Sequence, residues 1–294
     1  MRRSEGDARV LEAERLPPRL ADLEEPPARL YLHGELPRGP AVAIVGTRRA
    51  SELGLQFTRK LAGDLASAGV AVLSGGAEGI DTAAHEGALA VGGVTVVVAP
   101  AGFNRPYPPK NAGLFRRVVD AGGAYLSLLP DDVAATRGIF FARNGCLMAL
   151  AHAVVMAEAP VSGGTSNASK WARDLGRPLF VVPYAPGHWQ GAGCIEQIRL
   201  GARPVHRAQD ILMLLEAAGL RGLPRPAVEP TQLPLPISGM DPVLEALRAG
   251  ASHADQIAEQ TGLSLAAVQQ RILTLALSGV LVPGPWGSLK LVTS

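Results

Sequence analysis

The sequence predicts an α/β protein with a doubly wound, mostly parallel sheet and a small winged-helix domain after it. Six short runs of apolar, largely β-branched residues recur between residues 41 and 183, separated by alanine-rich stretches long enough for helices. A proline-rich stretch then precedes a segment with three helical patterns. Regular alternation of strand and helix is typical of a parallel sheet, because parallel neighbours require long crossover connections.

The six runs do not alternate apolar and polar residues, which indicates strands buried on both faces. Ligands of such sheets bind beyond the carboxyl ends of the strands, so we expect a site in the loops after each run. The predicted strands cover residues 41–45, 70–74, 94–99, 124–128, 153–159 and 179–183, and the predicted helices cover roughly 54–68, 81–91, 111–121, 141–151 and 166–175.

The C-terminal segment is typical of a winged helix-turn-helix. Five prolines mark residues 220–239 as an extended linker. From residue 240 onward, two short helical patterns precede a longer one over 264–279, and a hairpin is expected around 283–287. Arg271 is the only charged residue of the longer pattern, whereas a helix that reads a DNA groove usually brings several basic or amide side chains. We therefore expect this domain to contact protein or to dimerise, and to contribute little affinity for nucleic acid.

Composition indicates a folded, cytoplasmic protein. Apolar residues make up 47% of the 294 residues, and the formal net charge is only +2, so a polyanion would have to be recognised by a local patch. Cys146 and Cys194 lie far apart without zinc-ligand spacing, which fits a reducing compartment. No run of about 18 apolar residues is present, so we expect neither membrane insertion nor a signal peptide.

The loop after the first strand carries two arginines but only one glycine. It lacks the second and third glycines of the dinucleotide fingerprint, so we expect no nicotinamide or flavin cofactor. Amide groups at the start of the next helix and a guanidinium would instead converge on one phosphate, with a serine as helix cap. The alternative is that both arginines are solvated loop charges. The loop consists of Gly46, Thr47, Arg48, Arg49, Ala50 and Ser51.

Glycines crowd the second loop, where Gly75, Gly76 and Gly79 lie between a strand end and a helix. Their density predicts either a backbone nest for an anion or a tight turn that needs positive φ. The neighbouring arginine loop favours the anion. We expect Asp81 to cap the following helix and to interact with His85 four residues on, in preference to a metal site.

Cationic and aromatic side chains are interleaved in two later loops. A single nucleic-acid strand needs positive charge for its phosphates and flat surfaces for its bases, so this composition favours single-strand binding. Of the two adjacent phenylalanines, we expect Phe141 to lie in the core. The residues concerned are Arg105, Tyr107 and Lys110 in the third loop and Arg137, Phe140, Phe141, Arg143 and Asn144 in the fourth.

The fifth loop, over 158–170, adds Gly163 and Lys170 to the candidate binding residues. Motifs of catalysis are absent: the sequence contains no GxxxxGK[ST], HExxH or GxSxG. The strand ends offer only Asp81 and Glu158 as carboxylates. We therefore expect a binding protein without enzymatic activity.

The segments IVGTRRAS, SGGAEGIDTAAHEGAL, YPPKN, FFARN and GRPLFVVP follow one another in the chain. In this order they resemble the DNA processing protein A family (DprA, also called Smf) of bacterial natural transformation. The resemblance extends from about Leu16 to the linker, and the winged helix is similar to one that many members carry. It implies an extended Rossmann-like core that binds and protects single-stranded DNA, helps to load the RecA recombinase on it, and forms homodimers.

The resemblance also implies which residues face the DNA. Arg48 falls at the arginine of the family's first loop, while Phe140, Arg143 and Asn144 fall in its F-x-x-R-N segment. Lys170 lies where the local pattern diverges from the family.

The chain departs from the family pattern at three positions. Gly145 stands where an arginine usually follows the asparagine, and Asn167 and Ile195 replace other expected residues. These departures imply altered binding on that side of the site, with His188 or Arg199 as candidates to compensate. The predicted parts are an extension over 1–15, too short for the helical module that many members carry, a Rossmann-like DNA-binding domain over 16–219, the linker over 220–239 and the winged helix over 240–294.

Two alternatives to a DNA-binding role stay open. One is a Rossmann-like nucleotide phosphoribohydrolase, a family whose P-G-G-x-G-T-x-x-E motif supplies a phosphate cradle and a catalytic carboxylate. The fifth loop resembles that motif at Gly163, Gly164 and Thr165 but lacks its glutamate. The other is a recombinase adaptor that has lost DNA binding, which would dimerise without salt-dependent affinity for DNA.

Overall fold

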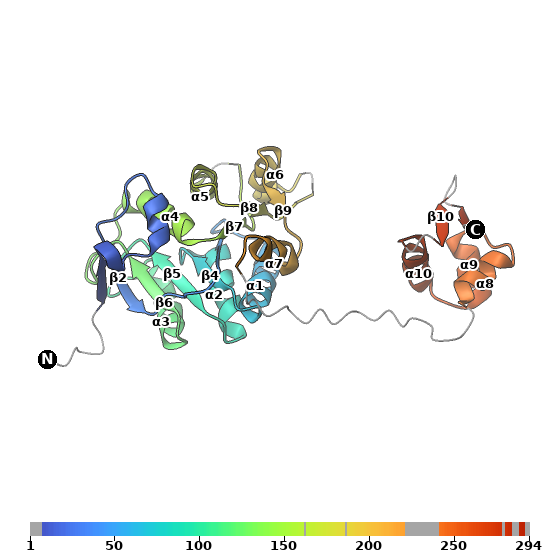
Figure 1. Ribbon diagram of the computed structural model, residues 1–294, viewed down its shortest axis with the longest axis horizontal. Helices are drawn as coiled ribbons and strands as arrows, with labels where there is room; N and C mark the ends of the chain where they lie inside the picture. Colours follow the sequence, from blue (N-terminus) through green and yellow to red (C-terminus); the bar gives the residue numbers. More distant parts are fainter. Residues whose placement is uncertain are drawn as a thin grey trace. The chain divides into compact units, whose positions relative to one another are not determined.

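The computed structural model contains a nine-stranded sheet covered by helices and a second, smaller helical unit (Figure 1). The chain divides into two compact units, Met1–Pro226 and Ala227–Ser294. The predicted linker over 220–239 lies almost entirely outside the described residues. The structure describes residues 8–161, 163–185, 187–220, 241–277, 280–283 and 288–291.

The first unit alternates strands and helices in the predicted order, and all six predicted strands and five predicted helices are present. Its strands are β1 (Arg9–Glu12), β2 (Arg29–Gly34), β3 (Ala41–Val45), β4 (Ala71–Ser74), β5 (Thr95–Ala99), β6 (Ala124–Ser127), β7 (Ala153–Met156), β8 (Leu179–Val181) and β9 (Arg203–Pro204). Its helices are α1 (Glu52–Ser67), α2 (Ile80–Ala90), α3 (Ala112–Asp120), α4 (Ile139–Leu150), α5 (Gly164–Asp174), α6 (Ala192–Arg199) and α7 (Ala208–Ala217), with 3₁₀ turns η1 (Ala13–Arg15), η2 (Pro18–Asp22), η3 (Pro109–Asn111) and η4 (Trp189–Gly191).

The sheet has the order β1-β2-β6-β5-β4-β3-β7-β8-β9 and is parallel except at one edge. There, β2 pairs antiparallel with both β1 and β6. The expectation of a short extension over 1–15 needs correction, because Arg9–Glu12 forms the edge strand β1. Strand β2 was not predicted, because only Leu30 and Leu32 of it are fully buried and it lacks the continuous apolar run of the central strands.

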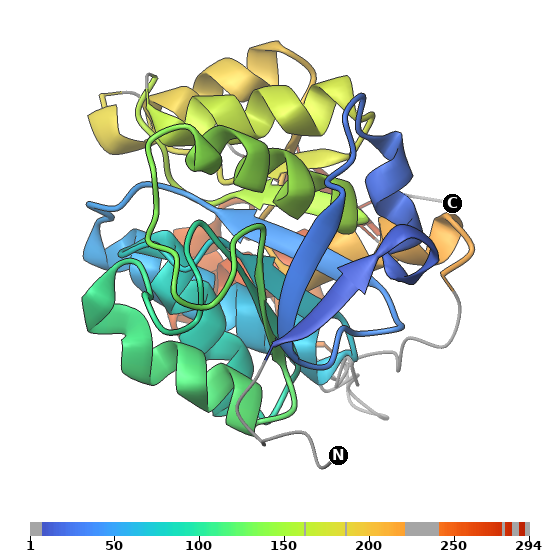
Figure 2. The ribbon, with the colours of Figure 1, turned by 90° about the vertical axis from the view of Figure 1, so that its left-hand side faces the viewer.

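Helices cover both faces of the sheet. Figure 2 shows α4, α5 and α6 on one face and α1, α2 and α3 on the other. Strand β3 lies near the middle, and all five of its residues are buried. Its side chains alternate between two cores, with Val42 and Ile44 packed in the core of α1, α2 and α7, and Ala43 and Val45 packed in the core of α4 and α5. This arrangement brings the ends of β3, β4 and β7 to one carboxyl edge.

Helix α2 begins differently from the prediction. Gly79, with φ of 77°, is the N-cap, and Asp81 lies in the first helical turn. His85 does not pair with Asp81, because its Nδ1 lies 2.7 Å from the Thr95 hydroxyl beneath the helix. Burial in this apolar setting lowers the pKa of His85 to about 3, so the imidazole stays neutral in the core.

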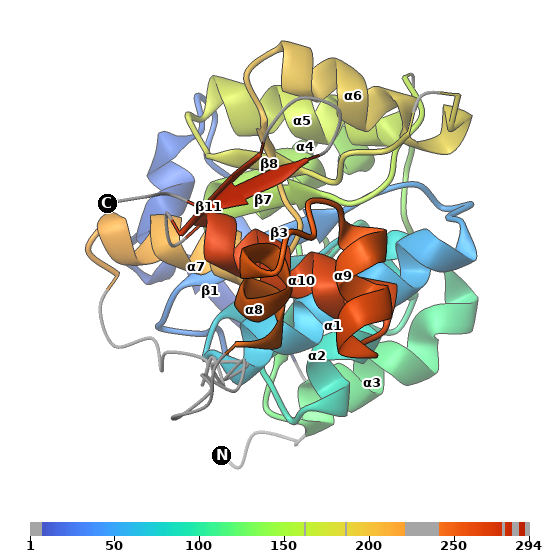
Figure 3. The same ribbon diagram turned by 90° about the vertical axis from the view of Figure 1, so that its right-hand side faces the viewer.

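The second unit has the predicted winged-helix architecture (Figure 3). Arg271 lies within hydrogen-bond distance of Asp241, with its Nε 2.6 Å from Oδ2. Asp241 also caps α8 by accepting from Val243 N at 2.9 Å. Arg271, the one charged residue of this unit's longest helix, is therefore paired with an acidic residue of the same unit. The turn expected around 283–287 lies almost wholly outside the described residues. The unit contains α8 (Pro242–Arg248), α9 (Ala254–Thr261), α10 (Leu265–Leu277) and the antiparallel pair β10 (Leu281–Pro283) and β11 (Leu289–Leu291).

Among the described residues, none of the helices has the length and apolar character that spanning a bilayer requires.

Close packing of α1 on α2 depends on Gly87. A Cβ at this position would lie 2.2 Å from the backbone oxygen of Arg59, which cannot move without shifting α1. We expect Gly87→Ala to lower the free energy of unfolding by about 1–3 kcal/mol, the usual cost of overpacking, despite the higher helix propensity of alanine. Urea denaturation followed by circular dichroism measures this loss.

Gly113→Ala is the matched control, because Gly113 is also helical but nothing lies within 4 Å of its added Cβ. We expect this variant to be as stable as the parent or more stable by up to about 1 kcal/mol. Equal stabilities of the Gly87 and Gly113 variants would contradict the packing argument.

Candidate functional site

A cleft of about 760 Å³ opens at the carboxyl edge of the sheet, where β3, β4 and β7 end. The loops after these strands and the start of α4 line it. Asp81, predicted as a helix cap, and Arg137 also line the cleft. The cleft brings together eight of the predicted binding residues: Gly46, Thr47, Arg48, Arg49, Phe140, Arg143, Asn144 and Gly163.

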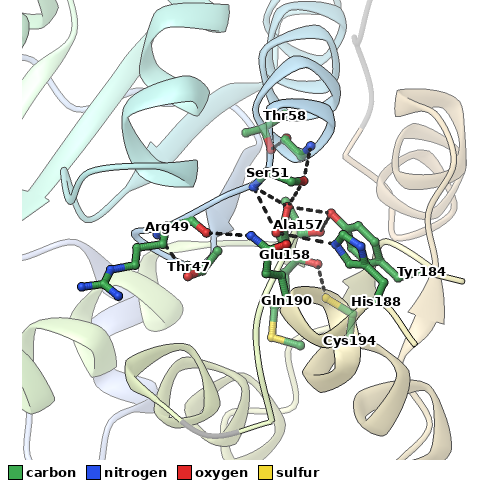
Figure 4. Close-up of polar contacts among 12 residues, drawn as sticks. Thr47, Arg49, Ser51, Thr58, Ala157, Glu158, Tyr184, His188, Gln190 and Cys194 are labelled. Carbon is green, nitrogen blue, oxygen red and sulfur yellow. Dashed lines mark hydrogen bonds and ion pairs between the residues drawn. The ribbon is translucent and has the colours of Figure 1, made fainter. Parts of the chain in front are cut away.

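The loop between β3 and α1 is held by its backbone and leaves its arginines in solvent. Thr47 N donates to the backbone oxygen of Glu158 at 2.7 Å, which ties the loop to the end of β7. Arg49 N donates to Thr47 Oγ1 at 3.2 Å, and Gln190 Nε2 donates to Arg49 O at 3.3 Å. The side chains of Arg48 and Arg49 are exposed, and Figure 4 shows the Arg49 guanidinium pointing away from Glu158.

A fully buried carboxylate, Glu158, anchors the other end of this loop (Figure 4). It accepts hydrogen bonds from Ser51 N at 3.1 Å, Ser51 Oγ at 2.7 Å and the Tyr184 hydroxyl at 3.2 Å, and His188 Nε2 lies 3.8 Å away. Burial and the negative charge of Glu158 raise the pKa of Tyr184, so its hydroxyl remains a donor. His188, a candidate to compensate for lost contacts, therefore faces this network.

Ser51 caps α1 as predicted, because its hydroxyl accepts from Gly54 N at 3.1 Å. The expected phosphate at the first amides of α1 needs correction. The carboxylate of Glu158 already lies against the N-terminus of this helix, where it receives the favourable interaction with the helix dipole. An external anion would therefore meet a negative charge there, and the cationic partners that face the cleft are the arginine side chains.

The glycines of the second loop serve packing and turn geometry, and none of them lines the cleft. A Cβ on Gly75 would lie 1.6 Å from Nη1 of Arg143, so only glycine leaves room for this guanidinium. Gly79 adopts a φ of 77°, and a Cβ added there would lie 2.4 Å from the backbone oxygen of Thr47. Gly76 has a φ of 75°. Of the two interpretations, a tight turn explains these glycines better than an anion nest. Gly76 and Gly79 have positive φ, and the loop packs closely against Arg143 and Thr47.

Arg143 forms part of the cleft wall and is only 6% exposed. Its Nη1 donates to Val98 O at 3.2 Å, and its guanidinium carbon lies 5.9 Å from the centre of the Phe140 ring. Burial lowers the pKa of Arg143, and nearby Asp81 opposes this shift. Burial likewise raises the pKa of Asp81, opposed by Arg143 and by hydrogen bonds such as the one from Ala77 N. The two side chains thus offset each other's charge at the base of the cleft.

The two adjacent phenylalanines of α4 have different environments. Phe140 lines the cleft and packs edge-on against Tyr107, with ring centroids 5.5 Å apart. The expectation that Phe141 is a core residue is wrong, because Phe141 is 57% exposed and contacts Trp171. The physical reason is position along α4: its later residues, 145–150, are buried, whereas its first turn projects from the core.

Three predicted cationic residues lie outside the cleft. Lys110 Nζ is 2.5 Å from Glu78 Oε2, and Lys170 Nζ is 2.5 Å from Asp174 Oδ2. Arg105 is exposed in the third loop and does not line the cleft. Any contact of these three with a nucleic acid would have to be made beyond the cleft.

Two of the residues that depart from the family pattern, Asn167 and Gly145, lie at the contact between α4 and α5. Asn167 Oδ1 accepts from Asn144 Nδ2 at 3.1 Å, which joins α5 to α4 beside the cleft. Gly145 is buried, and a Cβ there would lie 3.2 Å from the Trp171 ring. Arg199, the second candidate to compensate, pairs with Glu196 at 3.5 Å and does not line the cleft.

Replacing Glu158 with glutamine tests whether the carboxylate holds the loop. Glutamine has only one acceptor oxygen. Its NH₂ group would face the hydroxyl or amide donors of Ser51 or Tyr184, one of which would lose its acceptor. We expect Glu158→Gln to lower the free energy of unfolding by about 1–3 kcal/mol, the usual cost of leaving a buried donor without an acceptor. The single hydroxyl proton of Tyr184 is shared between Glu158 at 3.2 Å and the backbone oxygen of Ala157 at 3.0 Å, so Tyr184→Phe should cost only about 0.5–1.5 kcal/mol. Denaturant titrations that rank Tyr184→Phe as the more damaging variant would contradict this assignment.

Comparisons with known proteins agree with this architecture. The family model described as DNA recombination-mediator protein A matches residues 8–216, and the one described as the DprA winged helix domain matches residues 228–285. A DNA processing protein DprA of Mycobacterium tuberculosis is 39% identical over 243 residues, which cover 82% of this chain and 61% of that protein. The chain thus spans about three fifths of that relative. Protein Smf of Escherichia coli is 31% identical over 290 residues, which cover 95% of this chain and 76% of that protein.

Two solved structures share the fold of the first unit. DNA processing protein A from Streptococcus pneumoniae superposes with a TM-score of 0.66 at 30% identity, covering 70% of this chain and 74% of that one. The protein from Helicobacter pylori, whose structure is described for its single-stranded DNA binding mode, has a TM-score of 0.64 at 30% identity and covers 71% of this chain and 96% of that one. By its sequence, its sheet and its winged helix, the chain belongs to the DNA processing protein A (DprA/Smf) family.

Proposed function

We propose that this protein binds single-stranded DNA in the cleft at the carboxyl edge of its sheet. The observation that carries the proposal is the lining of the cleft, which contains four arginines, Arg48, Arg49, Arg137 and Arg143, together with the ring of Phe140. Asp81 is the one acidic residue among the lining residues that the structure describes. Such a combination of cationic groups with an aromatic surface suits a strand whose phosphates and bases are both accessible.

These residues would make different kinds of contact with the strand, because some are exposed and others are buried. Arg48, Arg49 and Arg137 are exposed at the cleft and would neutralise phosphates, releasing counterions. Phe140 would stack on a base, and the buried Arg143 supports that ring from within. Because stacking and phosphate contacts do not discriminate among bases, the affinity should depend little on sequence. A duplex keeps its bases paired inside, so it cannot use the aromatic surface in the same way.

The wider role we propose follows the family. The bound strand would be protected, and the protein would help to load the RecA recombinase on DNA taken up in natural transformation, acting as a homodimer in the cytoplasm. The structural description of the Helicobacter pylori relative as a single-stranded DNA binder supports the binding step. Buried Cys146 and Cys194, whose thiol pKa values burial raises to about 12, are unreactive thiols compatible with a reducing compartment. The role proposed is one of binding and delivery, without catalysis.

Reversing the charge of Arg48 tests the proposed site. We expect Arg48→Glu to weaken binding of every single-stranded oligonucleotide about equally, and to make the plot of log affinity against log salt concentration shallower by about one phosphate contact. Fluorescence anisotropy with labelled single-stranded and duplex oligonucleotides across a salt titration measures both effects.

Lys60→Glu is the matched control, since it changes the net charge equally but lies in α1 and pairs with Asp64, away from the cleft. We expect this variant to keep the wild-type slope. An unchanged slope for Arg48→Glu, or equal losses in both variants, would refute the role given to Arg48. Intact dimers without salt-dependent DNA affinity would favour the adaptor alternative.

A further inference from the structure

An exposed aromatic pair lies next to the cleft and has no part in the proposed site so far. Phe141 of α4 is 57% exposed, and its ring centroid is 5.1 Å from that of Trp171 on α5, with the ring planes tilted by 55°. Exposing this much aromatic surface to water is unfavourable. Because Trp171 holds this exposed ring from one side, the pair presents an aromatic surface on which a flat ligand can stack.

Gly145 sets the position of this pair. It is buried in α4, and a Cβ there would lie 3.2 Å from the Trp171 ring, so the indole packs directly over this glycine. Trp171 is thereby half-buried and supports Phe141 from one side.

The aromatic pair lies on two helices that also contribute residues to the cleft. Phe140, the residue before Phe141, lines the cleft, and so does Ala168, which precedes Trp171 by three residues on α5. Figure 2 shows α4 and α5 side by side above the sheet. Arg137, two residues before α4 begins, also lines the cleft and provides positive charge near the start of this helix.

We propose that Phe141 and Trp171 form a second stacking subsite, which takes a further base of the strand whose phosphates the cleft binds. The inference rests on the proposed function. A strand bound in the cleft and continuing along α4 would reach the Phe141 ring, and every nucleobase has a flat face that can stack on it. The cationic surroundings suit a polyanion. Because Gly145 lets the Trp171 indole pack against α4, the subsite would add a base contact to the phosphate contacts of the cleft.

The test compares strands with and without bases. Fluorescence anisotropy is measured with an oligothymidylate and with an abasic deoxyribose-phosphate strand of the same length, on the full chain. We expect Phe141→Ala to lower affinity for oligothymidylate at least about fivefold, because loss of one stacked base costs roughly 1–3 kcal/mol. The abasic strand should bind wild type and variant equally, and Phe141→Trp should retain affinity for oligothymidylate. Because Phe141 is exposed, the variant should fold, which a thermal melt verifies.

Met213→Ala is the control for loss of an exposed apolar side chain. Met213 is 61% exposed on α7 and does not line the cleft. We expect it to bind both strands as the wild type does. A variant that retains only Trp171 of the three tryptophans, through Trp189→Phe and Trp286→Phe, should lose fluorescence when oligothymidylate binds.

The outcomes separate this inference from the function on which it rests. If the wild type binds oligothymidylate and Phe141→Ala binds it equally well, the subsite is refuted while the cleft stands, and a protein partner becomes the better explanation of the exposed ring. If Phe141→Ala weakens both strands alike, the effect is not stacking and the subsite is also refuted. If the wild type binds neither strand at low salt, the proposed function itself fails.

Discussion

The hydrogen bonds to the buried carboxylate of Glu158 are the constraint on which the candidate site depends. Glu158 follows β7, and its side chain accepts from both the backbone and the hydroxyl of Ser51, the cap of α1. Its backbone oxygen accepts from Thr47 at the start of the same loop. One residue thus holds both ends of the loop that presents Arg48 and Arg49. A buried carboxylate is costly unless donors surround it, so the loop and the carboxylate stabilise each other.

A second consequence concerns the phosphate contacts proposed for this loop, which its arginine side chains would make. In many α/β proteins a phosphate sits on the N-terminus of the helix after the first strand. Here Glu158 occupies that end of α1, and the guanidinium groups of the loop remain exposed. Exposed guanidinium groups on a fixed backbone can follow a flexible phosphate chain, whereas a cradle of backbone amides fits a single phosphate. The cleft therefore suits a polymer better than a mononucleotide.

Much of this could be predicted from sequence, because continuous apolar runs mark buried parallel strands and strand order places their following loops at one edge. The positions of Arg48, Phe140 and Asn144 in the cleft followed from that rule. The role of Glu158 was missed because its partners, Ser51 and Tyr184, are distant in sequence. The glycines at 75 and 79 suggested an anion nest, since nothing in sequence shows that a guanidinium and a neighbouring loop fill the space. Phe141 was misplaced because an apolar pattern does not reveal where a helix leaves the core.

Hydrogen exchange of the full chain, with and without a saturating single-stranded oligonucleotide, shows most directly whether this edge of the sheet holds the strand. We expect slower amide exchange in peptides covering residues 46–51 and 137–145, where cleft residues lie, and unchanged exchange in α7. Protection confined to the winged-helix residues 241–277, with the cleft loops unaffected, would contradict it.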